Sequence, residues 1–516
     1  MKRIAVLYPI FFAIYPVLSL LAANLSETPI TQAIRPLLIY LLFSSGLLWA
    51  LSKVCKDTQR AAFITFLVVL ALFYYQIAMI VARILPGNLG VAQQSWGIFI
   101  LWAGFLGVLG TPWLWRKIKH HETLALALTV AGIIVVGISL VSIGFFYAER
   151  WFFRTTQSSV IHLEGEPQPD IYYIIVDGYA GAEVLQDLYG YDNTPFLEFL
   201  RQRGFYVADA ARSNYIQTTV SLASSLNLDY VTELPANSSN RGLVWNLIQY
   251  STVRATLEQH GYQTVSLTSG YQYTELRDAD LYLSHPDIPE INLFEAALLL
   301  TSPARILIDD LNILTGMLPT RRTHQDRILY VFEQLRHIPS VPGPKFVFAH
   351  FIAPHPPFVF DRDGQRLGSD EIFLLVDGDR FPGSVEEYLT GYAEQLVYIN
   401  TLLMETLDAI LENSATPPII LLQADHGPGA FTNFQSLADT CIWERTSILS
   451  AYYLPGVDTV PLYDSVTPVN SFRIVFDAYF GTDLGLLEDR VYYSTWSRPY
   501  DFIDVTELSY QPCELP

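Results

Sequence analysis

The sequence predicts a transmembrane helical region followed by an external α/β domain with a mainly parallel sheet, and three observations support this fold class. The chain of 516 residues is 51% hydrophobic and only 16% charged, which is more apolar than an ordinary soluble enzyme. The apolar residues are concentrated in long runs before residue 150. The rest of the chain alternates short apolar strands with helix-like segments, the pattern of an α/β/α domain.

Five long apolar runs occupy residues 4–24, 36–52, 61–82, 95–115 and 123–147. Each is close to the roughly twenty residues that a helix needs to cross the hydrocarbon core of a bilayer, and the interior of each is almost free of charge. Buried helices of a soluble bundle are the alternative, but five such lengths would need a very large core to cover them. We therefore expect about five transmembrane helices within residues 1–149.

Lysines and arginines in the short loops predict the orientation of these helices. One set of loops holds Lys2, Arg3, Lys53, Lys56, Arg60, Arg116, Lys117 and Lys119, and the opposite loops hold only Arg35 and Arg83. The positive-inside rule then places the N-terminus in the cytoplasm, and five crossings leave residues 150–516 outside a cell membrane. The first run starts like a signal peptide, but four more runs follow it, so we expect a multi-pass anchor.

The outer part is strongly acidic. Residues 1–149 hold ten of the 31 basic and four of the 51 acidic residues, which leaves residues 150–516 with a net charge of −26. Such a surface repels nucleic acid, and it disfavours anionic substrates at long range. A phosphate site here would need a metal or a local cluster of donors. Cys441 and Cys513 would both lie outside and could pair, whereas Cys55 would be cytoplasmic.

Four segments of the outer part read as strands, rich in β-branched and aromatic residues: 170–177, 262–268, 345–351 and 418–426. A further apolar strand is expected after Arg445. Helix-like segments lie between them, for example 243–260, 324–337 and 388–413. This repetition predicts a mainly parallel sheet covered on both faces. Ligands of such sheets bind beyond the carboxyl ends of the strands, so polar residues that end an apolar strand are the candidates for a site.

Polar residues of this kind follow three of the strands. Asp177 ends the strand at 170–177, and Asp425 and His426 end the strand at 418–426. His350 and His355 lie within "FVFAHFIAPHPPF", around the end of its strand. Each fragment alone is weak evidence for a site, because an Asp-Gly pair usually forms a turn and a lone histidine among prolines is usually a packed loop residue. Together, two carboxylates and an imidazole supply three ligands of a tetrahedral metal site. A hydroxyl could supply the fourth.

A hydroxyl-rich stretch, "SNYIQTTVSLASSLN" at residues 213–227, offers such a group. Serine and threonine at a helix start commonly cap the free N–H groups of the first turn. The other interpretation is that one hydroxyl is a nucleophile at the positive end of a helix, where an anionic phosphate would bind. The residues alone leave both open.

The order of these motifs resembles the alkaline phosphatase and sulfatase superfamily. The shared features are an Asp after the first outer strand, a Thr-x-x-Ser about forty residues later and a late Asp-His-Gly. Five membrane spans before an external domain look like the lipoteichoic acid synthases and the lipid A phosphoethanolamine transferases. The resemblance implies an alkaline-phosphatase-like α/β/α fold and one divalent cation, Mn, Zn or Mg. No histidine follows His426, so a complete second metal site is not expected.

The resemblance also implies roles for individual residues. Thr218 matches the nucleophile, with Thr219 as the adjacent alternative, and Asp177, Thr218, Asp425 and His426 would bind the metal. His355 resembles a histidine near the phosphate or leaving group, where it could donate a proton. His350 is a second candidate for substrate binding, although a packed core histidine is common in an apolar strand. Arg445 could contact a phosphate oxygen or form an ordinary surface ion pair.

These inferences predict a metal-dependent, membrane-anchored phosphotransferase or phosphoesterase. The expected donor is a phospholipid head group, phosphoglycerol or phosphoethanolamine, and the acceptor a glycan, a lipid or water. Sulfate-ester hydrolysis ranks lower, because the C/S-x-P-x-R motif of true sulfatases has only near misses in "CIWER" (441–445) and "TSPAR" (301–305). A non-catalytic receptor or scaffold on the same fold is the remaining alternative.

Overall fold

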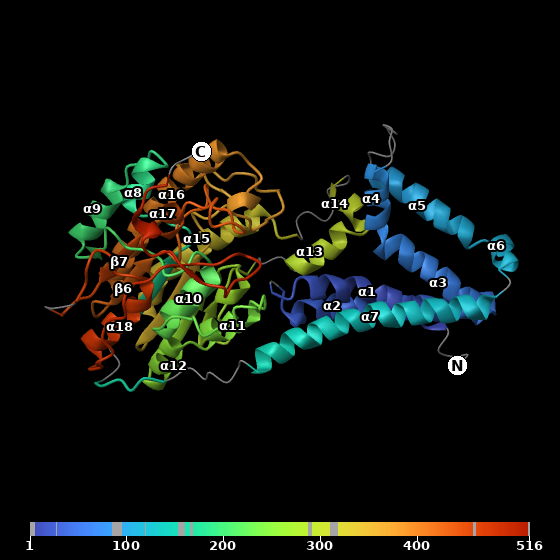
Figure 1. Ribbon diagram of the computed structural model, residues 1–516, viewed down its shortest axis with the longest axis horizontal. Coiled ribbons are helices and arrows are strands. Elements are labelled where there is room, and N and C mark those ends of the chain that lie inside the picture. Colours follow the sequence, from blue (N-terminus) through green and yellow to red (C-terminus); the bar gives the residue numbers. More distant parts are fainter. Residues whose placement is uncertain are drawn as a thin grey trace. The chain divides into compact units, whose positions relative to one another are not determined.

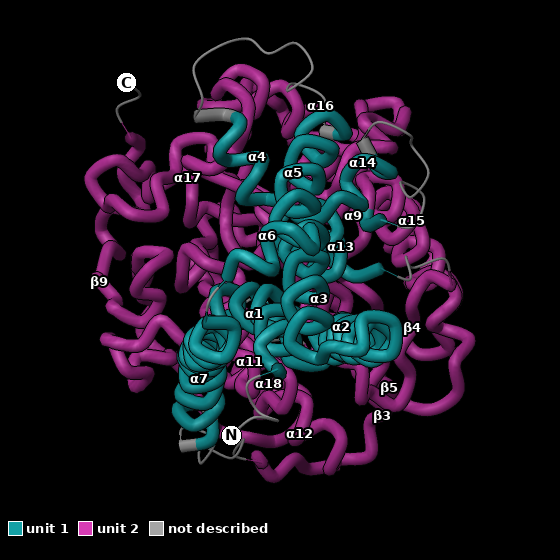
Figure 2. The backbone as a smooth tube through the Cα atoms, turned by 90° about the vertical axis from the view of Figure 1, so that its right-hand side faces the viewer, with its two compact units in different colours: residues 1–152, 289–319 teal, residues 153–288, 320–516 magenta. Residues whose placement is uncertain are grey.

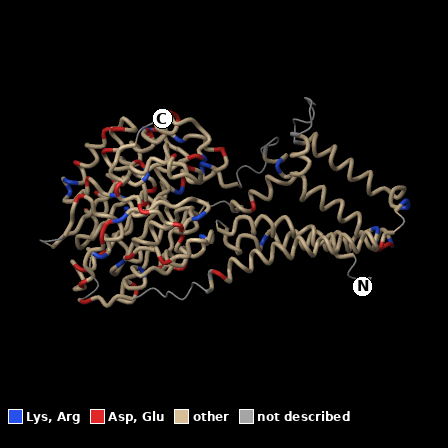
Figure 3. Tube along the Cα trace, viewed as in Figure 1, with Lys and Arg blue, Asp and Glu red and all other residues tan. Residues whose placement is uncertain are grey.

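The computed structural model describes residues 6–26, 28–84, 95–118, 120–152, 160–165, 169–286, 291–309, 318–457 and 461–513. The chain forms two compact units (Figure 2), one made of residues 1–152 and 289–319 and the other of residues 153–288 and 320–516. Lys2, Arg3 and Lys119, which contribute to the orientation prediction, lie outside the described residues. Charged residues are sparse along the helices of the first unit and frequent throughout the second (Figure 3).

The first unit is helical (Figure 1). Its N-terminal elements are α1 (Tyr8–Ala23), α2 (Ile30–Cys55), α3 (Thr58–Phe73), α4 (Tyr75–Ile84), α5 (Ser95–Leu109), α6 (Pro112–Lys117) and α7 (His121–Phe152). Within the described residues, α2 and the stretch His121–Glu149 of α7 are long and apolar enough to cross a membrane. The pair α3 and α4, bent by 57°, would make a third span if it crosses as one. The helices α1 and α5 are apolar but shorter, so the number of five crossings stays a prediction.

Two short helices from far along the chain also belong to the first unit. They are α13 (Leu293–Leu300) and α14 (Ala304–Asp309). Phe294 and Leu298 of α13 are buried in the same apolar cluster as Leu21 of α1. Glu295 accepts a hydrogen bond from Nε of Arg35 at 2.6 Å. The sequence shows no signal for this docking, because the segment reads as an ordinary apolar helix of the outer part.

The second unit contains a sheet of seven strands in the described residues. They are β1 (Ile171–Val176), β2 (Tyr206–Val207), β3 (Gln263–Leu267), β4 (Leu281–Leu283), β5 (Lys345–Phe351), β6 (Ile419–Gln423) and β7 (Ser450–Tyr453), in the spatial order β2-β7-β6-β1-β5-β3-β4. The five strands from β6 to β4 are mutually parallel, and β7 is antiparallel to both β6 and β2. The predicted mainly parallel sheet is therefore confirmed.

The helices of this unit are α8 (Ala182–Asp187), α9 (Thr194–Gln202), α10 (Thr218–Asn227), α11 (Gly242–Gln249), α12 (Thr252–Gln259), α15 (Arg321–His337), α16 (Val385–Asn413), α17 (Ile442–Thr446) and α18 (Pro468–Tyr479). Short 3-10 turns span Gln272–Thr274, Ile338–Ser340, Gly378–Arg380 and Leu508–Tyr510, and an antiparallel pair joins β8 (Tyr492–Tyr493) to β9 (Ile503–Asp504).

Helices cover both faces of the sheet. Tyr173 of β1 is the register partner of Phe348 in β5, and its ring meets Phe472 of α18 at 5.1 Å. Phe351 lies three residues after Phe348, so its side chain points to the opposite face, where its ring stacks on Phe332 of α15. Every residue of β1, β5 and β6 is buried, which explains why these strands are apolar on both faces.

A disulfide fastens the C-terminal end of the second unit. Cys441, the N-cap residue of α17, is bonded to Cys513 with a Cα–Cα distance of 5.5 Å and a sequence separation of 72. This is the pairing that the cysteine positions left open. It ties the helix that carries Arg445 to the last described residues of the chain.

Candidate active site

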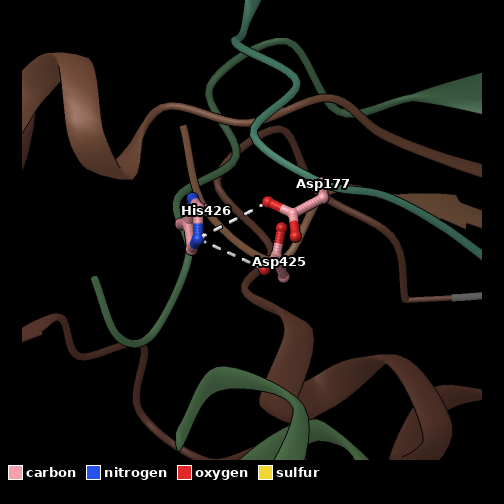
Figure 4. Close-up of side chains that lie close together, drawn as sticks. All are labelled: Asp177, Asp425 and His426. Carbon is pink, nitrogen blue, oxygen red and sulfur yellow. Dashed lines mark ion pairs between the residues drawn. The ribbon is translucent and has the colours of Figure 1, made fainter. Parts of the chain in front are cut away.

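Strand register brings the two candidate carboxylates together. In the parallel pair of β1 and β6, Ile171 lies opposite Ile419 and Ile175 opposite Gln423. Continuing that register by two residues places Asp177 opposite Asp425, where both strands end. Ligand atoms of Asp177, Asp425 and His426 all lie within 4.8 Å of one another, and the three residues are buried (Figure 4). The sheet therefore assembles three of the four predicted metal ligands.

Two oxygens of this cluster are left without donors. Oδ1 of Asp177 and Oδ2 of Asp425 are buried and have no hydrogen-bond partner in the described part of the chain. Nε2 of His426 lies 3.3 Å from Oδ2 of Asp425 and 3.7 Å from Oδ1 of Asp177. Buried acceptors without donors are costly, and carboxylate oxygens next to an imidazole are ligands suited to a divalent cation. The cluster fits a metal on these grounds.

His426 has the properties of a neutral metal ligand. Its burial, followed by the charge of Arg445, lowers the pKa of His426 to about 4. Nδ1 lies 2.8 Å from the carbonyl oxygen of Gly427, a contact in which Nδ1–H must be the donor. The lone pair of Nε2 then points toward the carboxylates. A carbonyl that fixes the tautomer of a histidine in this way is the usual second partner of a metal-binding imidazole.

The threonine of the hydroxyl-rich stretch joins the same cluster. Thr218 is the first residue of α10, and its Oγ1 lies 3.0 Å from Nε2 of His426. The N-cap residue is Gln217, and no side-chain hydrogen bond caps α10, so the structure does not show the capping role. Ser221 donates a hydrogen bond of 2.7 Å to the backbone oxygen of Asp425, which ties the first turn of α10 to the carboxylate loop. Thr219 is buried, whereas Thr218 is half-buried.

Arg445 lies beside the cluster and is buried. Its Nη2 lies 3.1 Å from Nε2 of His426, and its Nη1 donates to Oδ2 of Asp377 at 2.6 Å. Its Nε donates to the backbone oxygen of Ile216 at 2.9 Å. The ion pair considered for Arg445 therefore exists, but it is buried at the cluster. A guanidinium is a group that can bind phosphate oxygens in pairs, so the predicted phosphate contact of Arg445 is compatible with this position.

Asp377 is a residue of this site that the sequence did not single out. Oδ1 accepts a hydrogen bond from the Tyr388 hydroxyl at 2.7 Å, and Oδ2 lies 3.8 Å from Nε2 of His355. Burial would raise the pKa of Asp377, but Arg445 and then His355 outweigh it and hold the pKa well below its usual range. A Cβ at Gly429 would come within 2.8 Å of the carboxylate, so glycine is needed there.

The two histidines of "FVFAHFIAPHPPF" occupy different places. His350 is buried in β5, with Nε2 at 3.3 Å from Oδ2 of Asp177 and Nδ1 at 2.9 Å from the hydroxyl of Thr274. His355 is beside Asp377, and its backbone N–H donates to the backbone oxygen of Asp177 at 3.1 Å. The contact of His350 is thus with a carboxylate of the cluster, and that of His355 is with the carboxylate that holds Arg445.

A parallel sheet with an acid–histidine cluster at its carboxyl edge defines the class of protein: an α/β domain with a site where such folds bind their ligands. A sequence model of the sulfatase family matches residues 169–456, more than half of the chain. The chain belongs to the sulfatase family. No curated protein matches the chain significantly.

Three solved structures illustrate the range of similar folds. The C-terminal periplasmic domain of EcEptC from Escherichia coli, in complex with Zn, is 12% identical over 68% of this chain and 98% of that chain, with a TM-score of 0.44. The lipooligosaccharide phosphoethanolamine transferase EptA from Neisseria meningitidis is 10% identical over 92% and 94%, with a TM-score of 0.36. A putative sulfatase from Bacteroides thetaiotaomicron is 13% identical over 63% and 77%, with a TM-score of 0.39.

Proposed function

We propose that the chain is a metal-dependent, membrane-anchored phosphotransferase or phosphoesterase that moves a phospholipid-derived head group through Thr218. One observation carries the proposal: the hydroxyl of Thr218 lies 3.0 Å from Nε2 of His426, in a buried cluster where one oxygen of Asp177 and one of Asp425 have no hydrogen-bond donor among the described residues. A nucleophile, an imidazole and unsatisfied acceptors converge at one point. This is the combination that phosphoryl transfer through a covalent intermediate requires.

Asp177, Asp425, His426 and Thr218 would hold the cation. A bound divalent cation favours the alkoxide form of a hydroxyl and offsets negative charge on phosphoryl oxygens. Manganese, zinc and magnesium, in that order of preference, are the candidates. Two carboxylates and one imidazole do not select sharply among them.

The residues of the chain supply the remaining parts of the reaction. Oγ1 of Thr218 gives its proton to solvent and forms a bond to phosphorus, while the bond from phosphorus to the diacylglycerol oxygen breaks. The leaving oxygen takes up a proton, for which His355 is the candidate donor. N–H groups at the start of α10 and the guanidinium of Arg445 face the phosphoryl oxygens. A hydroxyl of a glycan or lipid, or water, then attacks phosphorus and releases Thr218.

Five crossings with the N-terminus inside would keep this chemistry at the outer leaflet. A contact within the first unit supports the orientation: Arg35, expected outside, pairs with Glu295, which comes from the part of the sequence also expected outside. The backbone N–H of Ile30 also donates to the hydroxyl of Tyr147 at 3.2 Å, near the expected outer end of α7. These contacts support a topology in which the start of α2 and the end of α7 lie on the same side of the membrane.

Sulfate-ester hydrolysis is the second candidate and is less well supported. Of the two near misses to the sulfatase motif, Cys441 is bonded to Cys513 and Thr301 lies at the end of α13 in the first unit. Neither occupies the position beside His426, where Thr218 is found. A receptor or scaffold role would not require the acid–histidine cluster to be complete.

The test is turnover of labelled phosphatidylglycerol and phosphatidylethanolamine by the full-length protein in lipid nanodiscs, with metal content measured in parallel. We expect Thr218→Ala to lower turnover by a factor on the order of 10³ or more and to abolish a phosphorylated Thr218 peptide in mass spectra of trapped enzyme. Thr219→Val tests the neighbouring hydroxyl and should retain turnover. Equal turnover by wild type and Thr218→Ala would remove Thr218 from the mechanism. Absence of metal and of turnover would favour the scaffold.

A further inference from the structure

One buried arginine of the second unit lacks a counter-ion. Four arginines in the described residues are at least nine-tenths buried: Arg212, Arg241, Arg254 and Arg445. Three have a carboxylate oxygen within salt-bridge distance, at 3.8 Å for Arg212 (Glu183), 2.7 Å for Arg254 (Glu258) and 2.6 Å for Arg445 (Asp377). Arg241, only 4% exposed, has none in the part of the chain that the structure describes. An unpaired buried cation is costly, so this exception calls for a ligand.

A second arginine shares the same aromatic ring. The guanidinium carbon of Arg241 lies 3.8 Å from the ring centroid of Trp496, and that of Arg380 lies 4.5 Å from it. Nη2 of Arg241 also donates to the backbone oxygen of Trp496 at 2.8 Å. Arg380 is exposed and likewise has no carboxylate partner among the described residues. Contact with an indole face offsets part of the cost of a buried cation, but it leaves most N–H donors of both forks unused.

This arginine pair borders the candidate nucleophile. Gln217, the residue before Thr218, donates its amide hydrogens to the backbone oxygens of Ser494 at 3.0 Å and Thr495 at 3.4 Å, directly before Trp496. Phe434 links the pair to the other side of the site. Its ring centroid lies 5.7 Å from that of Trp496 and 5.1 Å from the guanidinium carbon of Arg445. The pair is one layer of side chains away from the residues that would hold the reacting phosphate.

The nearby acids do not neutralise the pair. Asp379 precedes Arg380, but its Oδ1 accepts a hydrogen bond from the backbone N–H of Phe434 at 3.2 Å. Asp501 lies 3.4 Å from Arg498, an arginine two positions after Trp496. The outer part has a net charge of −26, so two unpaired guanidinium groups on one ring reverse the sign of the charge locally. Such a reversal attracts an anion that the rest of the surface repels.

We propose that Arg241, Arg380 and Trp496 form a second anion subsite, which binds a phosphate group of the substrate other than the one that reacts at Thr218. The planar forks of two arginines match the oxygens of a phosphate, and the indole holds both forks in place. This proposal rests on the proposed function of the Thr218 site. The phosphate could belong to the donor or to the acceptor, since both would pass the same nucleophile.

Kinetics of the full-length enzyme with two soluble donors test the subsite. One donor is a p-nitrophenyl phosphodiester of glycerol, and the other is the same diester with an additional phosphate on the glycerol. A parallel pair of acceptors is glycerol and glycerol 3-phosphate. We expect Arg380→Gln to raise KM about tenfold for the phosphate-bearing donor or acceptor, with kcat and the KM of its phosphate-free counterpart unchanged. The arm that responds identifies which substrate carries the phosphate.

Arg498→Gln is the matched control, because Arg498 is exposed and already paired with Asp501. It should leave both KM values at the wild-type level. Arg241→Gln should act like Arg380→Gln where it folds, and the exposed Arg380 keeps the test decisive where it does not. Unchanged KM values for Arg380→Gln in both arms would overturn the subsite while leaving Thr218-dependent turnover intact. Turnover of both donors that survives Thr218→Ala would instead overturn the proposed function.

Discussion

The two flanks of the candidate site differ in how fully their polar groups are satisfied. On one flank, the carboxylates of Asp177 and Asp425 keep buried oxygens without donors. On the other, the carboxylate of Asp377 accepts hydrogen bonds from both Arg445 and Tyr388. The arginine flank is therefore complete within the folded chain, whereas under the proposed function a cation would supply the missing partners of the carboxylate flank.

Removing one charge from the carboxylate flank should have the largest effect on metal binding and turnover. We expect Asp425→Asn to reduce bound metal from about one ion per chain to a small fraction and to lower turnover by a factor on the order of 10³, because several kcal/mol of charge stabilisation are lost. The amide also relieves repulsion between two buried carboxylates, so the Tm of this variant should not fall below that of chelator-treated wild type. Metal analysis and thermal unfolding check both parts. Full metal occupancy in Asp425→Asn would break the comparison.

A change on the arginine flank should affect catalysis but not metal binding. Asp377→Asn leaves the guanidinium of Arg445 without its carboxylate, and we expect kcat/KM to fall about 10–100-fold at unchanged metal content. Because the pKa of Asp377 is held below its usual range, the pair stabilises the fold above about pH 4 and loses that effect as the pH falls further. The free energy of unfolding of the variant should therefore depend less on pH below about pH 4 than that of wild type. Asp379→Asn, two residues later in the same loop, is the control for general loop damage.

The smallest effect is expected at Glu444, which precedes Arg445 and is fully buried. Burial raises the pKa of Glu444 to about 8, although hydrogen bonds from Tyr189 and the backbone of Phe431 oppose the rise. The stabilisation from its proton is fully present below about pH 4.5 and is lost as the pH rises through about 8. We expect the Tm of Glu444→Gln to fall less than that of wild type between pH 6 and pH 9, by a few degrees, with turnover almost unchanged. Parallel pH dependence in the two proteins would contradict the assignment.

The central sheet could be predicted because its strands are buried on both faces and therefore leave continuous apolar runs. The cluster followed from the same logic, since Asp177 and Asp425 each end such a run. Strands β2 and β4 have only two or three residues and leave no run to detect. Asp377 also follows an apolar run, "IFLLV", and precedes a glycine, but this segment forms no strand in the structure, and the importance of Asp377 comes from Arg445, 68 positions later. No local pattern encodes a contact of that separation.

Other features were hidden for related physical reasons. Seven of the eight residues of α13 are apolar, and only the folded chain shows that this helix packs with the N-terminal helices. Arg241 and Arg380 stand 139 positions apart and meet on the ring of Trp496, still further along the chain. The number of membrane crossings cannot be settled by apolar length alone, because α1 and α5 are shorter than a full span and α3 is bent against α4.

The bond between Cys441 and Cys513 has a consequence for biosynthesis. The helix that presents Arg445 begins at one of these cysteines, and the other lies 72 positions further along the chain. Disulfides persist where thiols are oxidised and not in the cytosol. Under the proposed topology, the arginine helix gains this brace only after both cysteines have been exported, so molecules retained inside the cell would carry an unbraced site.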